Sequence, residues 1–274
     1  FLHQEELAAL MDVPVEKITV VPLEIGGGFG GKEHIRISPL CVALSRKCAL
    51  PVQITLTREE VLIGTGPGAA TVSYVKIGAK NNGTITSLCA KFLYSGGCYP
   101  GGPIQRATWC ALMPYQIPNF ELKGYDVVTN KPKTVPYRAP GGAAATFAIE
   151  SSIDELAQKL NLDPLQIRKI NVSKEGDLAI NGTTFGPIGF EQILNRIESH
   201  HAWTSLLGNE NTARGLALGY WPSSSGESNC HIKLNVDGSV KLIVGSVDLS
   251  STRTGFAQIV AEELQISINK IQVI

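Results

Sequence analysis

The most informative stretch of this sequence reads GGGFGGKE, from Gly26 to Glu33. Five of its first six positions are glycine, and a segment rich in Val and Ile, residues 18–25, precedes it. Glycine costs conformational entropy on folding, so a cluster of glycines indicates a backbone that adopts positive φ or lies very close to another group. A tight turn at a crowded packing point explains the same pattern without any ligand. The stretch therefore predicts a special loop after a strand and leaves its purpose open.

Two nucleotide-binding motifs also match this loop. From Gly26 to Gly31 it satisfies G-x-G-x-x-G, yet dinucleotide folds usually place an acidic residue about 20 positions onward. Glu59 lies 28 positions after Gly31, and a hairpin follows it. The phosphate motif G-x-x-x-x-G-K-[ST] matches through Lys32, but Glu33 stands where a hydroxyl must ligate magnesium. A buried carboxylate at Glu33 is better suited to accept substrate N–H groups or to donate a proton, and dinucleotide binding stays as a weaker alternative.

Charge and hydropathy exclude several classes of protein. The chain has 24 basic and 24 acidic side chains, so it has no long-range attraction for nucleic acid or for anionic membrane surfaces. No apolar run reaches the roughly 18 residues that a membrane-spanning helix needs. The 274 residues, 43% of them hydrophobic, supply a core for one large or two smaller domains. We expect a globular, cytoplasmic protein without nucleic-acid or membrane partners.

The six cysteines form no framework for a metal. No two of them stand at the two-residue spacing of zinc and iron–sulfur motifs, and the five histidines are scattered. Reduced thiols in a cytoplasmic protein explain the cysteines without any ligand. We therefore expect no metal ligand among the side chains of this chain.

Hydrophobic periodicity predicts a mixture of helices and strands. Helices are expected at residues 2–11, 36–48, 105–112, 143–160, 163–170, 190–198 and 254–264, and strands at 18–25, 52–56, 70–79, 85–94, 214–221 and 270–274. Asn82-Gly83 marks one hairpin turn, and a second hairpin is expected around residues 236–239. Because few strand–helix units repeat, the fold class is α+β. Polar turns after Val172 place a boundary there, between domains 1–172 and 173–274.

Both ends of the sequence indicate a piece of a longer protein. The chain begins at Phe1 with neither an initiator Met nor a signal-like segment, and it ends in the strand-like residues 270–274. We expect the native chain to extend in both directions.

Several motifs together make the sequence resemble the molybdenum hydroxylases, the family of xanthine dehydrogenase, aldehyde oxidase and aerobic carbon monoxide dehydrogenase. The loop 26–33 resembles the family's loop beside the molybdenum, and residues 137–142 with the following helix resemble the second cofactor loop. Further matching segments lie at 56–60, 215–221, 235–240 and 245–249. The likeness runs over nearly the whole chain. It implies the α+β molybdopterin-binding fold, in a fragment of the family's molybdopterin-binding subunit.

The resemblance also implies a cofactor and the residues near it. Gly28, Phe29 and Gly30 are implied to approach the metal and the substrate, and Arg138 is implied to contact the pyranopterin. A guanidinium suits phosphate and carbonyl recognition because its donors form a rigid fork. The molybdenum–pyranopterin would be molybdopterin or its cytosine dinucleotide. The family carries its iron–sulfur centres and FAD on other domains or subunits.

Two charged residues are implied to meet the substrate. Glu33 matches the glutamate that faces the substrate ring in purine-oxidising members, and Arg106 lies 32 residues before Arg138, the spacing of the arginine that stabilises developing negative charge. Together they favour a small N-heteroaromatic, purine-like substrate over a simple aldehyde, hydroxylated with water as the source of oxygen. The family's general base is implied beyond Ile274, so no catalytic residue is expected within the chain.

The sequence departs from the family at two places. Ala139-Pro140 replace Gly-Phe in the family's Arg-Gly-Phe-Gly-Gly, and Leu249–Thr252 stands where the family has Met-Gly-Gln-Gly. The second change removes a glutamine and two glycines near the cofactor, and it favours an alternative: a non-catalytic scaffold or assembly module of the same fold. We expect the chain by itself to be inactive and free of cofactor. The sequence leaves open whether the protein forms a homodimer.

Overall fold

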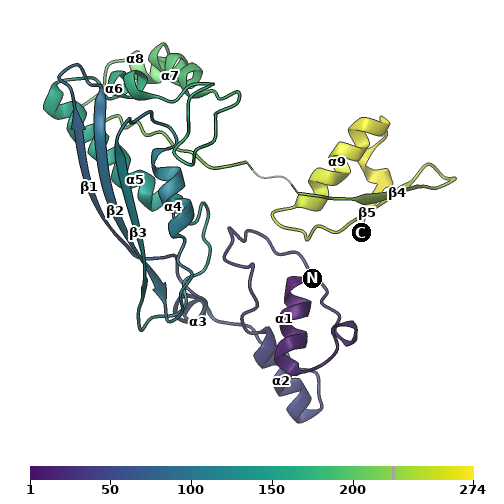
Figure 1. Cartoon of the computed structure of the whole chain (residues 1–274). Helices are drawn as coiled ribbons and strands as arrows, with labels where there is room; N and C mark the ends of the chain where they lie inside the picture. Colours follow the sequence, from purple (N-terminus) through teal and green to yellow (C-terminus); the bar gives the residue numbers. More distant parts are fainter. Residues whose placement is uncertain (224–225) are drawn as a thin grey trace. The chain divides into compact units, whose positions relative to one another are not determined.

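The computed structural model describes residues 1–223 and 226–274, which form two compact units. The central unit comprises Leu62–Pro222, and the discontinuous unit combines Phe1–Val61 with Ser223–Ile274. Helix α3 (Arg58–Gly64) lies where the chain passes from one unit to the other. Figure 1 traces the elements of each unit along the sequence. Helices and strands are mixed in both units, which confirms the predicted α+β class.

The central unit is built on a three-stranded sheet of order β1-β2-β3. Strands β1 (Thr71–Ala79) and β2 (Ile85–Gly97) pair antiparallel, and β3 (Phe120–Val128) lies parallel to β2. Leu88, Ala90, Phe92 and Tyr94 of β2 are buried, whereas Cys89 and Lys91 between them are exposed. Because side chains alternate along a strand, one face of the sheet carries the core.

Five helices complete the central unit: α4 (Ile104–Leu112), α5 (Gly142–Leu160), α6 (Pro164–Asn171), α7 (Phe190–Glu198) and α8 (His201–Thr204). Helix α5 packs against β1, α4 and α6 (Figure 1). Every fourth residue from Ala145 to Ala157 is buried, which is the apolar stripe that a core-facing helix needs. The main-chain N–H of Asn161, in the left-handed conformation, donates to the carbonyls of Ala157 and Gln158 and ends α5.

Helix α4 crosses β3 at a glycine. A Cβ added to Gly124 would lie 2.1 Å from Cγ2 of Ile104, which is closer than any non-bonded contact allows. The missing side chain therefore lets α4 lie directly on the strand. This glycine also interrupts the apolar alternation of the segment, so β3 was not predicted from the sequence pattern.

A buried ion pair ties the core of the central unit together. Arg168 of α6 is fully buried, and its Nη2 lies 2.8 Å from Oε2 of Glu150 on α5. The same guanidinium donates to Asp154 Oδ1 at 2.7 Å. Glu150 also accepts from the Tyr115 hydroxyl at 2.6 Å and from the main-chain N–H of Leu218 at 2.9 Å. The carboxylate thus joins four segments that are remote in sequence.

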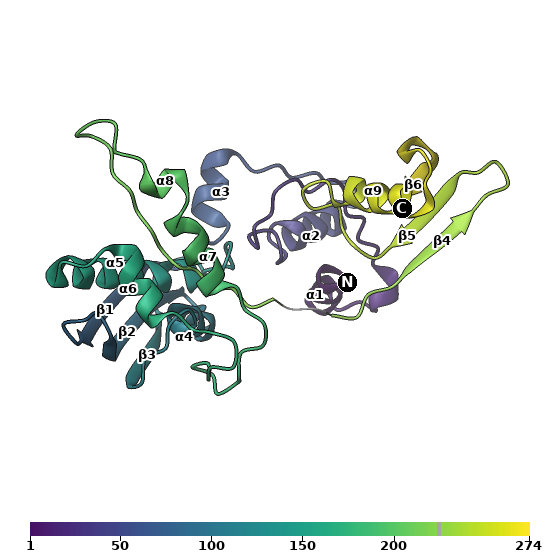
Figure 2. The same cartoon turned by 90° about the horizontal axis from the view of Figure 1, so that it is seen from above.

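The discontinuous unit contains helices α1 (Leu2–Met11), α2 (Ser38–Cys48) and α9 (Thr252–Leu264), with 3₁₀ turns at Val15–Lys17 and Ile268–Lys270. Its sheet has the order β4 (Cys230–Leu234), β5 (Val240–Val244) and β6 (Ile271–Val273). Strands β4 and β5 form the expected hairpin, and β6 runs parallel to β5 after α9. A small core of Val240, Leu242 and Val260 holds α9 on this sheet (Figure 2).

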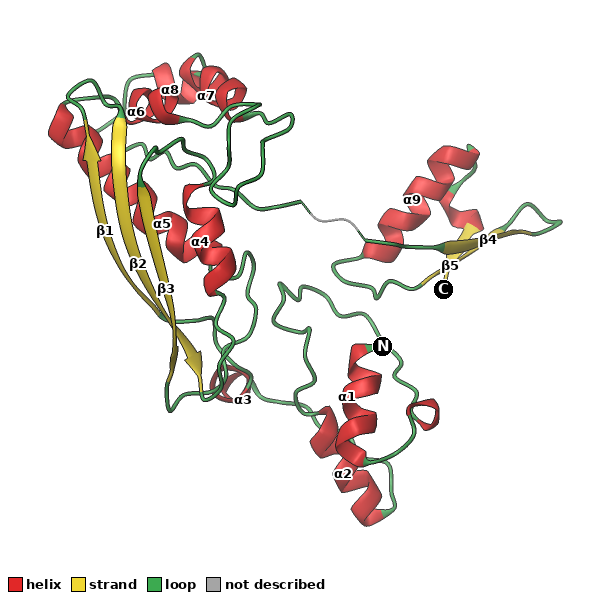
Figure 3. Ribbon diagram, viewed as in Figure 1, coloured by secondary structure: helices red, strands yellow, loops and turns green. Residues whose placement is uncertain are grey.

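Three predicted strands are wrong. Residues 18–25, 52–56 and 214–221 belong to no strand, and Figure 3 draws no strand between α1 and α2. A β-rich run becomes a strand only where a neighbouring edge accepts its hydrogen bonds. The side chains of Val21 and Leu23 are 71% and 76% exposed, and the N–H of Leu218 donates to a carboxylate instead of a strand. Helix α3 also lies where the sequence predicted none.

Removing the buried carboxylate should make the central unit less stable to unfolding. We expect Glu150→Ala to lower the free energy of unfolding by about 3–5 kcal/mol, because the Arg168 charge would stay buried with its main partner lost. Tyr115→Phe removes one hydrogen bond to a charged group and should cost about 1.5–3 kcal/mol. Urea unfolding followed by circular dichroism measures both.

The matched control is Lys174→Ala. Lys174 pairs with Glu191 at 2.6 Å, but about half of each side chain is exposed to solvent. An exposed pair of this kind is worth roughly 1 kcal/mol or less. Equal losses for Glu150→Ala and Lys174→Ala would contradict the role given to the buried pair.

Candidate functional site

The glycine loop of the discontinuous unit makes two successive turns. The N–H of Gly31 donates to the carbonyl of Gly28 at 2.8 Å, and that of Glu33 to Gly30 at 3.3 Å. Gly26 and Gly30 have φ of 66° and 85°, a region in which glycine has no steric cost. Phe29 also has positive φ, 53°, which is rare for a bulky residue and marks a strained backbone.

The loop is hydrogen-bonded to the segment that follows β5. The N–H of Ile25 donates to the carbonyl of Asp248 at 3.1 Å, and the N–H of Ser250 donates to that of Gly26 at 3.0 Å. A Cβ on Gly28 would lie 2.9 Å from Cδ1 of Leu249, so a side chain there would press on this segment. The glycine loop and residues 248–250 therefore form one local structure.

The charged end of the loop differs from the sequence expectation. The Lys32 ammonium donates to the carbonyl of Ile25 at 2.6 Å, so it fastens the loop to itself. Glu33 is exposed, and the prediction of a buried carboxylate is wrong for the described structure. The side chain of Phe29 is 52% exposed. The loop thus presents an aromatic ring and a carboxylate at the surface of its own unit.

A second candidate loop lies at the start of α5 in the central unit. Ala139 and Gly141 have φ of 54° and 77°, and the N–H of Gly142 donates to the carbonyl of Ala139 at 3.0 Å. The Tyr94 hydroxyl donates to the Gly141 carbonyl at 2.7 Å. Burial raises the pKa of Tyr94 to about 12, so the phenol keeps its proton and remains a donor. Arg138 is exposed at the outer end of this loop.

Arg106 lies beside this second loop because α4 packs on α5. A Cβ on Gly141 would lie 2.3 Å from the carbonyl oxygen of Pro103, so glycine is needed where the loop meets the start of α4. The Arg106 guanidinium lies over the Trp221 ring, 5.2 Å from its centre. Burial raises the pKa of the Cys110 thiol, one helical turn further along α4, and the Arg106 charge acts in the opposite direction.

The structure thus divides the predicted site residues into two sets. Gly28, Phe29, Gly30 and Glu33 belong to the discontinuous unit, whereas Arg106 and Arg138 belong to the central unit. Within the central unit, the packing of α4 on α5 brings the segments that carry the two arginines together. Trp221 was missed by sequence reasoning, since nothing in its local pattern indicates a contact with α4.

Metal sites, cysteine thiols and membrane-spanning helices are three other kinds of functional feature that the described residues could provide. Among residues 1–223 and 226–274, no cluster of three or more His, Cys, Asp or Glu side chains is placed to hold a metal ion. All six cysteines are free thiols, and Cys110 is buried. No helix in the described part of the chain is long and apolar enough to cross a membrane.

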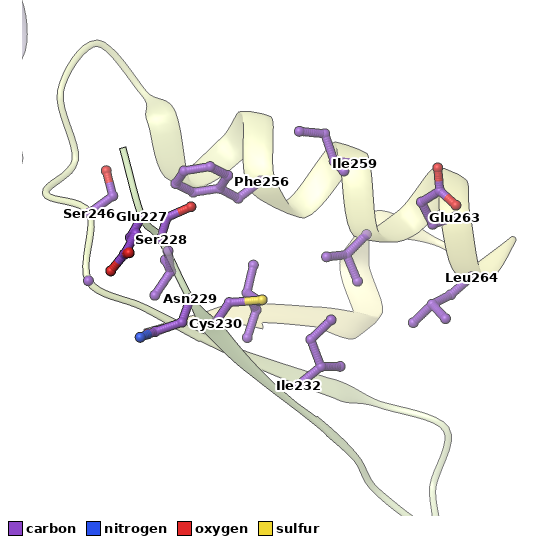
Figure 4. A pocket seen from close by; sticks show the side chains of 14 residues that line it. Glu227, Ser228, Asn229, Cys230, Ile232, Ser246, Phe256, Ile259, Glu263 and Leu264 are labelled. Atoms are coloured by element: carbon purple, nitrogen blue, oxygen red, sulfur yellow. The ribbon is translucent and has the colours of Figure 1, made fainter. Parts of the chain in front are cut away.

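An apolar groove of about 860 Å³ lies between the β4–β5 hairpin and α9 (Figure 4). Ile232, Phe256 and Ile259 line it, and the carboxylates Glu227 and Glu263 lie at its opposite ends. Nothing in the sequence pattern predicted this groove. It contains none of the predicted site residues.

Comparison with known proteins identifies two matching family models. One described as a molybdopterin cofactor-binding domain matches residues 1–172, and a second with the same description matches residues 194–274. Together they cover most of the chain.

Curated relatives are similar over most of this chain but are much longer. A probable xanthine dehydrogenase subunit from Bacillus subtilis is 35% identical over 70% of the chain and 26% of its own length. The aldehyde oxidoreductase molybdenum-binding subunit PaoC of Escherichia coli is 28% identical over 98% of the chain and 38% of its own length. The chain therefore spans less than two fifths of either relative.

Solved structures share the fold. The aldehyde oxidoreductase of Desulfovibrio gigas superimposes with a TM-score of 0.85 at 23% identity, over 100% of this chain and 32% of its own. Quinoline 2-oxidoreductase of Pseudomonas putida gives 0.86 at 22% identity, over 98% of this chain and 38% of its own. The likeness confirms the predicted fold type.

The glycine loop should tolerate a methyl group poorly even where space is open. A Cβ on Gly26 would meet nothing within 4 Å, so the cost of Gly26→Ala comes from its positive φ alone. We expect a loss of about 1–2 kcal/mol of local stability. Hydrogen exchange in residues 245–251 should accelerate, because Ser250 is bonded to Gly26.

Gly255→Ala is the matched control. Gly255 lies inside α9 with open space around it and no positive φ, so alanine should raise stability by about 0.5–1 kcal/mol. If Gly26→Ala left the exchange of residues 245–251 unchanged, the coupling of loop and segment would be refuted.

Proposed function

The chain belongs to the molybdopterin cofactor-binding domain family, and from this premise we propose that it is part of the molybdenum-binding subunit of a molybdenum hydroxylase. The proposed reaction is oxidative hydroxylation of a small substrate, with water as the source of oxygen. One observation supports the proposal: both loops that resemble the family's cofactor loops contain left-handed turns, at Gly26, Phe29 and Gly30 in one loop and at Ala139 and Gly141 in the other. We propose that the activity resides in the longer protein and that this chain alone is inactive and free of cofactor.

The residues present fit a pterin cofactor. At Gly26 the space beyond Cα is open, which lets a planar or phosphorylated group approach the backbone. Gly28 and Gly30 with the half-exposed ring of Phe29 would line the metal side, and the exposed guanidinium of Arg138 would bind a phosphate or a pterin carbonyl. When bound, the molybdenum–pterin group supplies the two-electron redox chemistry. The cofactor would be either molybdopterin or its cytosine dinucleotide, and the residues named here do not distinguish the two forms.

Substrate recognition is assigned to Glu33 and Arg106. The Glu33 carboxylate would accept an N–H of a purine-like heterocycle, and the permanent charge of Arg106 would stabilise negative charge that develops on the ring. No ion pair neutralises Arg106 in the part of the chain that the structure describes, which leaves its donors available to substrate. These two residues favour an N-heteroaromatic over an aldehyde.

The partners follow from the same proposal. Iron–sulfur centres and FAD would be carried by other domains or subunits and would accept the electrons from the cofactor. Several relatives are named as molybdenum-binding subunits, which supports an enzyme of several subunits. We also propose that the chain divides into domains 1–172 and 173–274. A cytoplasmic location and the formation of a homodimer are further proposals.

The scaffold alternative is favoured by the segment Leu249–Thr252. It lacks the glutamine of the family's motif, so one amide that would contact the cofactor is missing. The dinucleotide alternative is weakened, because a dinucleotide fold places its glycine loop directly after a strand and residues 18–25 form no strand. Molybdenum analysis of the longer protein separates the first alternative from the enzyme: a scaffold would hold none.

Charge removal at the two substrate residues tests the proposal. In the full-length enzyme, we expect Glu33→Gln and Arg106→Ala each to lower kcat/KM for an N-heteroaromatic substrate by roughly 100-fold or more. Arg106→Ala removes the cation that would meet developing negative charge, and Glu33→Gln replaces the charged acceptor of the substrate N–H by a weaker neutral one. Aldehyde turnover should fall far less. Steady-state kinetics with one substrate of each class is the measurement.

The control is Glu121→Gln, which changes an exposed carboxylate on β3 that pairs with Lys123 at 2.7 Å. It should leave both substrates unaffected. If both Glu33→Gln and Arg106→Ala leave the turnover of the N-heteroaromatic unchanged, the proposed recognition of a purine-like substrate is wrong.

A further inference from the structure

Trp221 is placed to fix the position of Arg106. The guanidinium carbon of Arg106 lies 5.2 Å from the centre of the Trp221 ring, within the range of a cation–π contact, and tryptophan is the strongest aromatic partner for a cation. Arginine has a long side chain that would otherwise sample many rotamers at an exposed position. The contact therefore selects a subset of guanidinium orientations.

The ring of Trp221 lies against the start of α5, and the segment that carries it is held by two further contacts. A Cβ on Gly142 would lie 3.5 Å from Cζ3 of Trp221, so the ring rests against the bare backbone at the start of α5. Three residues earlier, the buried N–H of Leu218 donates to Glu150 Oε2. Tyr220 packs against the small cluster around Met113 and Phe185. The buried ion pair thus fixes the segment that carries the ring.

An aromatic support differs chemically from an acidic one. A carboxylate would orient Arg106 but would also neutralise it and occupy its N–H donors. A ring contacts the face of the guanidinium and leaves the in-plane donors and the net charge available. Among the described residues Arg106 has the ring and no ion pair, which is the arrangement that a group needs when it must meet negative charge on a ligand.

We propose that Trp221 is a positioning residue, which orients Arg106 toward the developing negative charge of the substrate while leaving the guanidinium charge unpaired. This role rests on the proposed function, in which Arg106 meets the substrate. Trp221 does not itself touch the reacting atoms. Its effect on turnover must therefore pass through Arg106.

The contact is tested first without any turnover. The chain has three tryptophans, Trp109, Trp203 and Trp221, and labelling with 5-fluorotryptophan gives one ¹⁹F resonance for each. Arg106→Gln should shift the Trp221 resonance and leave that of Trp203 in place. If the Trp221 resonance does not move, the contact between Arg106 and Trp221 is absent and the proposal falls.

The role is tested by kinetics in the full-length enzyme. Trp221→Leu should lower kcat and kcat/KM for an N-heteroaromatic together, by roughly 10- to 100-fold, because a misplaced group loses transition-state stabilisation. Trp221→Phe keeps a ring and should recover most of the rate. In an Arg106→Ala background, Trp221→Leu should cause no further loss.

The outcomes separate the two proposals. If Arg106→Ala leaves turnover unchanged, the substrate role of Arg106 fails, whatever the ¹⁹F result. If Arg106→Ala is impaired but Trp221→Leu is harmless, or lowers the rate by the same factor in both backgrounds, the positioning role fails and the substrate role stands. Rescue by phenylalanine excludes a general loss of folding as the cause in Trp221→Leu.

Discussion

The central unit depends on one buried carboxylate. Glu150 accepts hydrogen bonds from Arg168, from the Tyr115 hydroxyl and from the N–H of Leu218. Two buried charges are costly to remove from water, and they stabilise a fold only when further hydrogen bonds satisfy them. Here burial raises the pKa of the Tyr115 hydroxyl well above its ordinary value, and the neighbouring carboxylate raises it further, so the phenol stays a donor. The result is a core that accepts one arrangement of these segments.

That constraint reaches the candidate site through α5. The helix carries Glu150 in its middle and the Arg138–Gly142 loop at its start, so the orientation of one sets the position of the other. The segment that contains Leu218 continues to Trp221, which returns to the same end of α5. A polar interaction inside the core therefore positions two exposed groups, the loop and the ring. The glycines at 141 and 142 allow the close approach that this requires.

Much of the helical part of the fold could be predicted, most clearly at residues 190–198, where apolar side chains recur with the helical period. Residues 2–11 and 190–198 form helices with the expected bounds, and the buried stripe of α5 lies where periodicity placed it. Strands at 18–25 and 214–221 were wrong, because composition does not show whether a partner edge exists. The glycine positions of the site followed from backbone chemistry. Trp221 did not, since its contacts come from α4 and α5, far away in sequence.

The two departures from the family change side chains more than backbone. Ala139 and Ser250 stand where the family has glycine, yet both keep positive φ, 54° and 55°. A non-glycine residue in this conformation costs about 1–2 kcal/mol, so the surrounding hydrogen bonds must hold it there. Ser250 is held by its bond to Gly26, and Ala139 by the N–H of Gly142. The turns therefore keep glycine-like paths, and the departures lie in the side chains: Ser251 has a hydroxyl where the family's glutamine has an amide.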